Sequence, residues 1–289
     1  MKPLRTRLME VRSKLGVPWE VVKRDYVLSL TLLGISGVEP LRRALVFKGG
    51  TALKKCYFGD YRFSEDLDFS TSGVAPSGRA LDSAIAEACT LAKDFVDPYA
   101  PVEIFSERYE EKEPHPRRQE AFKISARLPW QRTPATHVLI EITTDEKILL
   151  PIGVRNVIHE YGEPLDIQIP VYALEEIVAE KLRAILQYAE QLERRGWARS
   201  RSRDYYDLWR VFGAYRSHLD LDEFVALLRQ KCSVRNAAFN DYKDFFRPKV
   251  LAHVEETWEQ WLGRLVPDLP PYASVISDLR RELSSQIPG

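Results

Sequence analysis

The sequence predicts an α+β fold, in which an N-terminal mixed sheet with flanking helices is followed by a C-terminal helical domain. Short apolar runs with a period of two recur up to about residue 143. From about residue 172 the apolar period lengthens to about three and a half. Because the first period is typical of strands and the second of helices, we place an α/β domain at 1–170 and a helical domain at 171–289.

The first domain is expected to begin with a helix and then to alternate strands with helices. The expected elements are a helix at 18–35, a strand at 44–47, a short helix at 51–57, a strand at 63–70, a helix at 79–96 and strands at 101–109, 120–128 and 137–143. A proline-containing turn is expected at 111–119, and the sheet is expected to end with the strand at 137–143.

The second domain shows only helical periodicity. The expected helices lie at 173–190, 203–215, 220–232, 240–263 and 272–285. Neither an internal repeat nor a low-complexity tract interrupts either domain.

Bulk composition limits the classes of partner. The chain has 289 residues, is 45% hydrophobic, and balances 42 Lys and Arg against 42 Asp and Glu. A neutral protein does not attract a polyanion through its overall field, so such a partner must bind a local basic patch. No apolar run reaches the roughly 18 residues that a membrane span needs, and the N-terminus lacks the apolar core of a secretory signal. We therefore expect a cytoplasmic protein with no membrane partner.

The cysteines are expected to be structural. Cys56, Cys89 and Cys232 are odd in number, lie far apart and lack metal-ligand spacing. This pattern is typical of the reducing cytoplasm and gives no disulfide framework.

Two carboxylates in the segment "FSEDLDFS" indicate a metal site. Side chains alternate along a strand, so Asp66 and Asp68 project from one face, with Leu67 and Phe69 on the other. Like charges this close repel unless a divalent cation lies between them. Mg²⁺ commonly binds through one or two carboxylates plus substrate phosphates, which suits nucleotidyl transfer. Alternatively, the two aspartates simply border a strand.

The preceding segment "VFKGGTALKK" offers groups for a phosphate. Gly49 and Gly50, at the start of a short helix, can present backbone N–H groups to a phosphate, or they can form a plain turn. The hydroxyl of Ser64 can donate to a phosphate oxygen or serve a turn. Lys54 and Lys55 can approach the phosphates, although lysines on a short helix more often face solvent. Within one strand–turn–helix–strand unit, glycines and carboxylates together favour the functional interpretation.

The pair "GGTALKK" and "FSEDLDFS" resembles the motifs of the AbiEii/AbiGii-type nucleotidyltransferase toxins. This type IV toxin–antitoxin family is a branch of the DNA polymerase β-type superfamily and is similar to the mycobacterial MenT-type toxins. The resemblance implies a polymerase β-like sheet, a two-metal Mg²⁺ site on the aspartate pair, and a third carboxylate from a later strand. Glu141 is the nearest candidate and Asp145 the second. Glu141 is also compatible with an edge strand that faces solvent.

Two later motifs extend the resemblance. Lys181 lies within an apolar helical stripe, four residues from both Ile177 and Ile185, so it either snorkels past the core or meets an anionic partner. The family places a lysine for nucleotide contact in this helix. It also has an essential aspartate in the segment "SRDYYDLWRVF", which we match to Asp204, with Asp207 as the alternative. Helix capping is another role for Asp204.

A basic segment at 194–203 provides the local patch for a polyanion. It contains five arginines and no acid, among them Arg199, Arg201 and Arg203, and Trp197 can stack on an unpaired base. Alternatively, the segment is a mobile basic loop. Known members of the family transfer nucleotides to the acceptor end of tRNA and are neutralised by a cognate antitoxin. The resemblance therefore implies tRNA and an antitoxin as partners, while the oligomeric state stays open, a monomer included.

The residues predict a metal-dependent nucleotidyltransferase that uses an NTP. The resemblance further implies a toxin of a toxin–antitoxin or phage-defence system that transfers NMP to an RNA acceptor, the 3′ end of tRNA, and so blocks translation. Asp66, Asp68 and Glu141 are expected to bind two Mg²⁺ ions, Lys181 to stabilise the triphosphate, and Asp204 to orient Lys181 or the acceptor. An alternative enzyme uses the same site on a protein or a small molecule. A third interpretation is a nucleotide- or RNA-binding module without catalysis.

Overall fold

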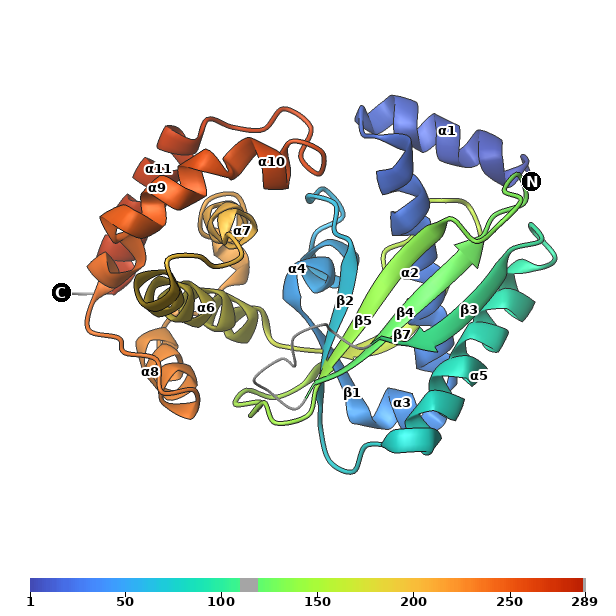
Figure 1. Cartoon of the computed structure of the whole chain (residues 1–289), viewed down its shortest axis with the longest axis horizontal. Helices are drawn as coiled ribbons and strands as arrows, with labels where there is room; N and C mark the ends of the chain where they lie inside the picture. Colours follow the sequence, from blue (N-terminus) through green and yellow to red (C-terminus); the bar gives the residue numbers. More distant parts are fainter. Residues whose placement is uncertain (110–118, 288–289) are drawn as a thin grey trace. The chain divides into compact units, whose positions relative to one another are not determined.

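The computed structural model describes residues 1–109 and 119–287 and divides into two compact units, Met1–Tyr172 and Ala173–Gly289 (Figure 1). The first unit contains a mixed sheet with helices, and the described part of the second consists of helices. This architecture confirms the predicted fold class. The turn expected at 111–119 lies outside the described residues, except for Gln119, which begins a strand.

Within the described residues the sheet has seven strands in the order β3-β4-β5-β2-β1-β7-β6. Their bounds are β1 Leu45–Lys48, β2 Asp66–Thr71, β3 Glu103–Arg108, β4 Gln119–Arg127, β5 Thr136–Thr143, β6 Gly153–Asn156 and β7 Gln168–Val171. Strand β2 is central: it pairs antiparallel with β1 and parallel with β5.

The prediction that the sheet ends with the strand at 137–143 is wrong. Strands β6 and β7 form an antiparallel pair, and β7 joins β1 in parallel through Phe47 and Val171. Each of these strands has only four residues, and they include Gly153 and Pro170, which are unfavourable inside strands. A pattern of period two is not detectable over so short a run.

Helices α2 and α5 cover one face of the sheet (Figure 1). The helical segments of this unit are α1 Leu4–Leu15, α2 Trp19–Gly37, α3 Glu39–Ala44, α4 Gly49–Ala52, the π-helix η1 Leu53–Tyr57 and α5 Gly78–Val96. A Cβ atom at Gly34 would lie 2.0 Å from the carbonyl oxygen of Ala88. Glycine at this position therefore permits the close contact between α2 and α5.

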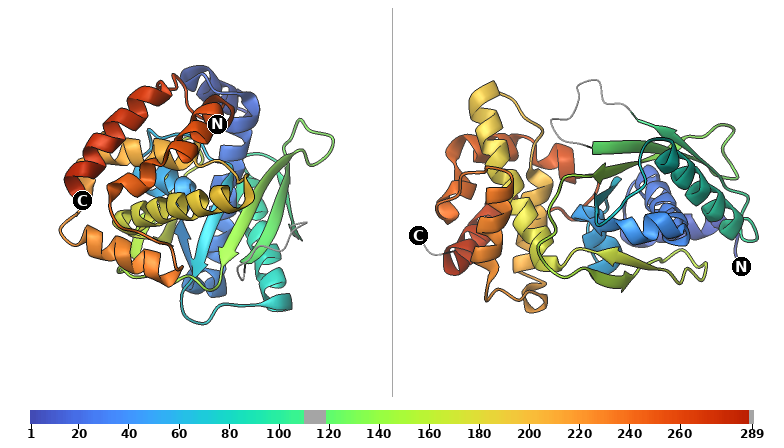
Figure 2. Two further views of the ribbon diagram at one scale, coloured as in Figure 1. Left: turned by 60° about the vertical axis from the view of Figure 1, so that its left-hand side comes forward. Right: turned by 90° about the horizontal axis from the view of Figure 1, so that it is seen from below.

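In the second unit, α6 packs against α7, α8 and α9 (Figure 2). The helices are α6 Leu174–Arg195, α7 Ser202–Phe212, α8 Phe224–Val234, α9 Pro248–Glu256, α10 Trp258–Leu262 and α11 Tyr272–Gln286, with 3-10 turns at Arg216–His218 and Tyr242–Phe246. The single helix expected at 240–263 is wrong. Pro248, which lacks an N–H group, starts α9, and Thr257 leaves the helical conformation between α9 and α10.

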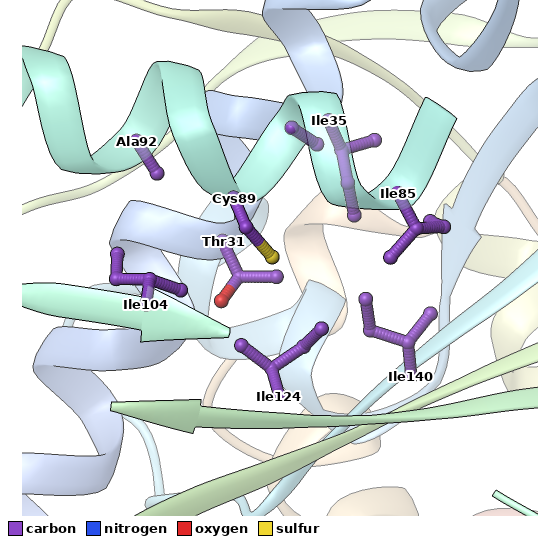
Figure 3. A pocket seen from close by; sticks show the side chains of 9 residues that line it. Thr31, Ile35, Ile85, Cys89, Ala92, Ile104, Ile124 and Ile140 are labelled. Carbon is purple, nitrogen blue, oxygen red and sulfur yellow. The ribbon is translucent and has the colours of Figure 1, made fainter. Parts of the chain in front are cut away.

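Apolar side chains and one threonine fill the space between α2, α5 and the sheet (Figure 3). They are Thr31, Ile35, Ile85, Ala88, Cys89, Ala92, Ile104, Ile124 and Ile140. The gap among them is too small for a water molecule, so it is core packing and not a ligand site. All three cysteines are buried free thiols, and burial raises their pKa to about 12 for Cys56 and about 11 for Cys89 and Cys232.

None of the helices in the described ranges is both long and apolar enough to cross a membrane.

A buried polar cluster attaches α1 to α2. Arg7 Nη1 lies 2.7 Å from Glu163 Oε2, and the Tyr26 hydroxyl donates to Glu163 Oε1 at 2.7 Å. His159 Nε2 lies 3.1 Å from the same carboxylate. Burial by itself raises the pKa of Glu163, but the hydrogen bonds from His159, Arg7 and Tyr26 outweigh it and lower the pKa to about 2. The carboxylate therefore stays ionised inside the fold.

This cluster predicts a loss of stability in acid. Glu163 titrates at about 2 in the folded chain and ordinarily at 4.5, so its stabilising contribution is complete above pH 4.5 and is lost as the pH falls toward 2. The free energy of unfolding should fall by on the order of 3 kcal/mol over this window through Glu163 alone. Urea unfolding between pH 5 and pH 2 measures this, and Glu163→Gln should flatten the curve. An unchanged curve in that variant contradicts the assignment.

Candidate functional site

The aspartate pair lies on the face of β2 opposite the core. Asp66 and Asp68 are half-buried, whereas Leu67 and Phe69 are fully buried on the opposite face. The alternation expected from the sequence is therefore present. Helices α2 and α5 pack on the face of Leu67 and Phe69, so neither of these helices covers the carboxylates.

Glu141 is the direct neighbour of Asp68 across the parallel β2–β5 pair. It is half-buried and shares the face of the aspartates, because paired residues of adjacent strands point the same way. The alternative of an edge strand is wrong, since β5 lies between β4 and β2. Asp145, the other candidate for a third carboxylate, is exposed and lies beyond the end of the strand.

The glycine turn lies directly against Asp68. Gly49 has φ +77°, a left-handed conformation that favours glycine, and a Cβ atom there would lie 2.4 Å from Asp68 Oδ2. Gly49 and Gly50 open helix α4, whose N-cap residue, Lys48, makes no side-chain cap hydrogen bond. The Thr51 hydroxyl donates to the carbonyl of Asp66 and so attaches α4 to β2. Position 49 therefore requires glycine for two independent reasons, the left-handed φ and the lack of space for a Cβ atom.

This arrangement suits a cation that is shared with a phosphate. In the described part of the chain, no group of three or more His, Cys, Asp or Glu side chains could hold a metal ion by itself. Mg²⁺ rarely has an all-protein cage and is usually bound by one or two carboxylates plus phosphate oxygens. Asp66 and Asp68 supply such carboxylates, and the Gly49 turn brings backbone N–H groups beside them. The residues therefore fit Mg²⁺ bound together with a nucleotide.

The two lysines after the glycines do not face solvent. Lys54 Nζ donates to the carbonyls of Gly59 and Tyr61 at 3.3 and 3.4 Å and lies 4.2 Å from the centre of the Phe63 ring. Lys55 is 2% exposed and pairs with a buried aspartate of α2. A solvent-facing position is thus wrong for both. A nucleotide contact by Lys54 stays a prediction.

Ser64 is buried, two residues before β2. Its predicted contact with a phosphate stays a prediction.

Lys181 meets anionic partners inside the second unit. Its Nζ lies 2.8 Å from Asp204 Oδ1 and 2.7 Å from Asp207 Oδ2, which links α6 to α7. The lysine therefore does not snorkel to solvent. The N-cap residue of α7 is Arg201, and Asp204 lies in the first turn with its carboxylate on Lys181, so capping is not the role of Asp204. Both aspartates that the sequence left as alternatives contact the lysine.

The predicted basic segment has an aromatic partner that sequence reasoning missed. The guanidinium groups of Arg199 and Arg203 lie 5.2 and 5.3 Å from the centre of the Trp261 ring, a cation–π arrangement. Arg201 Nη1 lies 3.3 Å from Asp204 Oδ2 and so belongs to the lysine cluster. Trp261 is about 60 residues away in sequence, and no local pattern connects it to the arginines.

Comparison with known proteins identifies a family for the chain. The profile of the family described as "Nucleotidyl transferase AbiEii toxin, Type IV TA system" matches residues 33–281. This range spans most of both units. No curated protein matches the chain in sequence.

A solved structure has a similar fold. MenT4, a nucleotidyltransferase toxin from Mycobacterium tuberculosis H37Rv, superposes with a TM-score of 0.60 over 92% of this chain and 83% of its own. The two sequences are 23% identical, so the likeness concerns the fold.

The lysine cluster predicts unequal effects for its two aspartates. Asp207 is fully buried and its side chain has no access to water, whereas the side chain of Asp204 is 14% exposed. Asp207→Asn should therefore lower the free energy of unfolding by about 3 kcal/mol or more, because it leaves a buried ammonium undercompensated. Asp204→Asn should cost only ~1–2 kcal/mol. Urea unfolding of both variants measures this, and equal losses would contradict the structural division between them.

Proposed function

The chain belongs to the AbiEii family of nucleotidyltransferase toxins of type IV toxin–antitoxin systems, and from this premise we propose that it transfers a nucleoside monophosphate from an NTP to an RNA acceptor. The acceptor proposed is the 3′ end of tRNA. A nucleotide added at that end prevents aminoacylation, so the reaction would block translation.

The observation that carries this proposal is the contact between the glycine turn and Asp68. A Cβ atom at Gly49 would lie 2.4 Å from Asp68 Oδ2, so the backbone reaches the carboxylate at a distance that no other residue permits. A nucleotide triphosphate needs both a cation and N–H donors at one place. In this proposal the carboxylates would bind the cation and the glycine turn would supply the N–H donors.

The described residues have distinct roles in this proposal. Asp66 and Asp68, together with phosphate oxygens of the NTP, would hold two Mg²⁺ ions, and Glu141, beside Asp68 in the sheet, would be the third carboxylate. When bound, Mg²⁺ lowers the pKa of an attacking hydroxyl and offsets the charge of the phosphates. The amides of Gly49 and Gly50 would orient the triphosphate. The hydroxyl of Ser64, two residues before β2, would donate a hydrogen bond to a phosphate oxygen.

Lys181 would stabilise the negative charge of the triphosphate as pyrophosphate leaves. Its ammonium lies within 2.8 Å of both Asp204 and Asp207. The side chain is therefore already ordered and would lose little conformational entropy on binding the triphosphate. The two carboxylates fix the direction of the lysine side chain. Asp204, the more exposed of the pair, would be the one to meet the acceptor.

The basic segment would bind the acceptor. The guanidinium groups of Arg199 and Arg203 both lie against the Trp261 ring, which restricts their positions, and both would contact phosphates of the acceptor. Trp197 is 62% exposed and offers a flat surface to an unpaired base. The type IV toxin–antitoxin family also implies an antitoxin partner.

Nucleotide transfer should depend on the aspartate pair. With purified protein, Mg²⁺, total tRNA and each α-³²P-labelled NTP in turn, label should appear on tRNA with at least one nucleotide. Asp66→Asn should reduce the rate by ~100-fold or more, because the cation loses a ligand at the reacting phosphate. Denaturing gels measure the transfer.

Asp94→Asn, which alters an exposed carboxylate on α5, is the matched control and should keep the wild-type rate. Equal activity of Asp66→Asn and wild type contradicts the assignment of the site. Label on a protein or a small molecule in place of tRNA would identify a different acceptor for the same chemistry. Nucleotide binding without any transfer would indicate a binding module.

Acceptor binding should depend on the stacked arginines. The double variant Arg199→Ala and Arg203→Ala should bind tRNA more weakly, with a plot of log affinity against log salt shallower by about 1.5, since two phosphate contacts are lost. Arg42→Ala with Arg43→Ala, which removes two exposed arginines of α3, is the control. Filter binding over a salt series gives both slopes. Equal effects of the two double variants would reject the basic segment as the acceptor surface.

A further inference from the structure

The glycine turn continues directly into a π-helix. The segment η1, Leu53–Tyr57, follows α4 without a break, and the N–H of Phe58 donates to the carbonyl of Leu53 at 2.7 Å. π-Helical segments are rare, and they occur frequently at functional sites. Helix α4 begins at Gly49 and continues into η1. Contacts that immobilise η1 therefore also immobilise the turn that faces Asp68.

A fully buried ion pair holds this π-helix against α2. Lys55 Nζ lies 2.6 Å from Asp25 Oδ2 and 2.9 Å from the hydroxyl of Ser29. The hydroxyl of Tyr161 donates to the same oxygen of Asp25 at 2.7 Å. Lys55 and Asp25 are 2% and 3% exposed. The ammonium of Lys55 is therefore held by two side chains of α2, Asp25 and Ser29, and Tyr161 in turn holds Asp25.

The rest of η1 is attached to β6, to the segment after it and to the residue that follows β7. The carbonyl of Lys55 accepts a hydrogen bond from the N–H of Ile158 at 2.7 Å. The guanidinium of Arg155 lies 4.2 Å from the centre of the Tyr57 ring, and the Tyr57 hydroxyl donates to the carbonyl of Tyr172. The π-helix is thus held on two sides, by α2 and by the segment at 155–161.

A buried ion pair of this kind contributes little net stability, so its main effect is on the position of the groups that it joins. Burial raises the pKa of Asp25, but the nearby ammonium groups of Lys55 and Lys54 outweigh it and lower the pKa below its usual range. Burial lowers the pKa of the Lys55 ammonium, and the charge of Asp25 opposes that shift. The two groups therefore form an ion pair that is buried away from solvent. Replacing such a pair by uncharged groups of similar size often leaves stability unchanged or improved, so its benefit lies in the fixed direction of its hydrogen bonds.

We propose that Asp25 and Lys55 are positioning residues for the nucleotide site: their ion pair locks the π-helix and thereby fixes the Gly49–Gly50 amides against Asp68. This inference rests on the proposed function. Neither residue touches the nucleotide. Losing the pair should loosen the turn and weaken the hold on the triphosphate, while the carboxylates and Lys181 are retained.

The test uses the full chain and the double variant Asp25→Asn with Lys55→Met, which removes both charges with little change in volume. Lys55→Met alone would leave an unpaired buried carboxylate and so threatens folding; the double variant avoids this. The control is Glu103→Gln with Arg127→Met, which removes another ion pair of the same unit, on strands β3 and β4. Urea unfolding establishes that each variant is folded.

Two readouts follow. Amide hydrogen exchange, measured without nucleotide, should become about tenfold faster across residues 49–57 in the Asp25 and Lys55 double variant, and β4 should be unaffected. In the transfer assay, KM for the NTP should rise about tenfold or more, with kcat and the KM for tRNA nearly unchanged. The control should match the wild type in both readouts.

Unchanged exchange across 49–57 overturns the proposal, because the pair would then not fix the turn. Faster exchange with an unchanged KM for the NTP also overturns it, because the turn would then not position the nucleotide. A wild-type chain that transfers no nucleotide with any acceptor would instead reject the proposed function; the exchange measurement still decides whether the pair fixes the turn.

Discussion

The approach of the Gly49 backbone to the Asp68 carboxylate is the constraint on which the site depends. A left-handed φ at Gly49 turns the chain from β1 into α4, and the missing Cβ leaves room for Asp68 Oδ2. The strand order places β2 between β1 and β5, so Asp68 has the end of β1 on one side and Glu141 on the other. Helices α2 and α5 lie on the opposite face. Backbone N–H groups and carboxylates therefore lie together on one face of the sheet, and these are the groups that bind a triphosphate and a cation.

Ionic contacts fix α6 on two sides in the second unit. On the side of α7, Lys181 pairs with Asp204 and Asp207. Toward α8, Lys231, which is fully buried, lies 2.6 Å from a carboxylate oxygen of Glu176 and 3.1 Å from one of Glu180. A helix held in this way presents its lysine in one direction, which suits a role in stabilising charge without reorganisation.

Much of the arrangement of the candidate site could be predicted from sequence because its signals are local. The alternation around Asp66 and Asp68, the paired glycines and the apolar stripe around Lys181 each lie within a few residues of one another. The partner of Lys55 and the Trp261 stack could not be predicted, since Asp25 and Trp261 are distant in sequence and only the tertiary fold brings them to their partners. The short strands β6 and β7 were missed because four residues carry too little periodicity.

Electron paramagnetic resonance of Mn²⁺ binding, with and without a non-hydrolysable analogue of each NTP, tests directly whether cation and nucleotide share one site. An analogue should tighten Mn²⁺ binding, because the ion then gains phosphate oxygens beside Asp66 and Asp68. The double variant Asp66→Asn and Asp68→Asn should lose this effect. Mn²⁺ binding that is indifferent to all four analogues, or equal in the double variant, would contradict a shared site for cation and nucleotide.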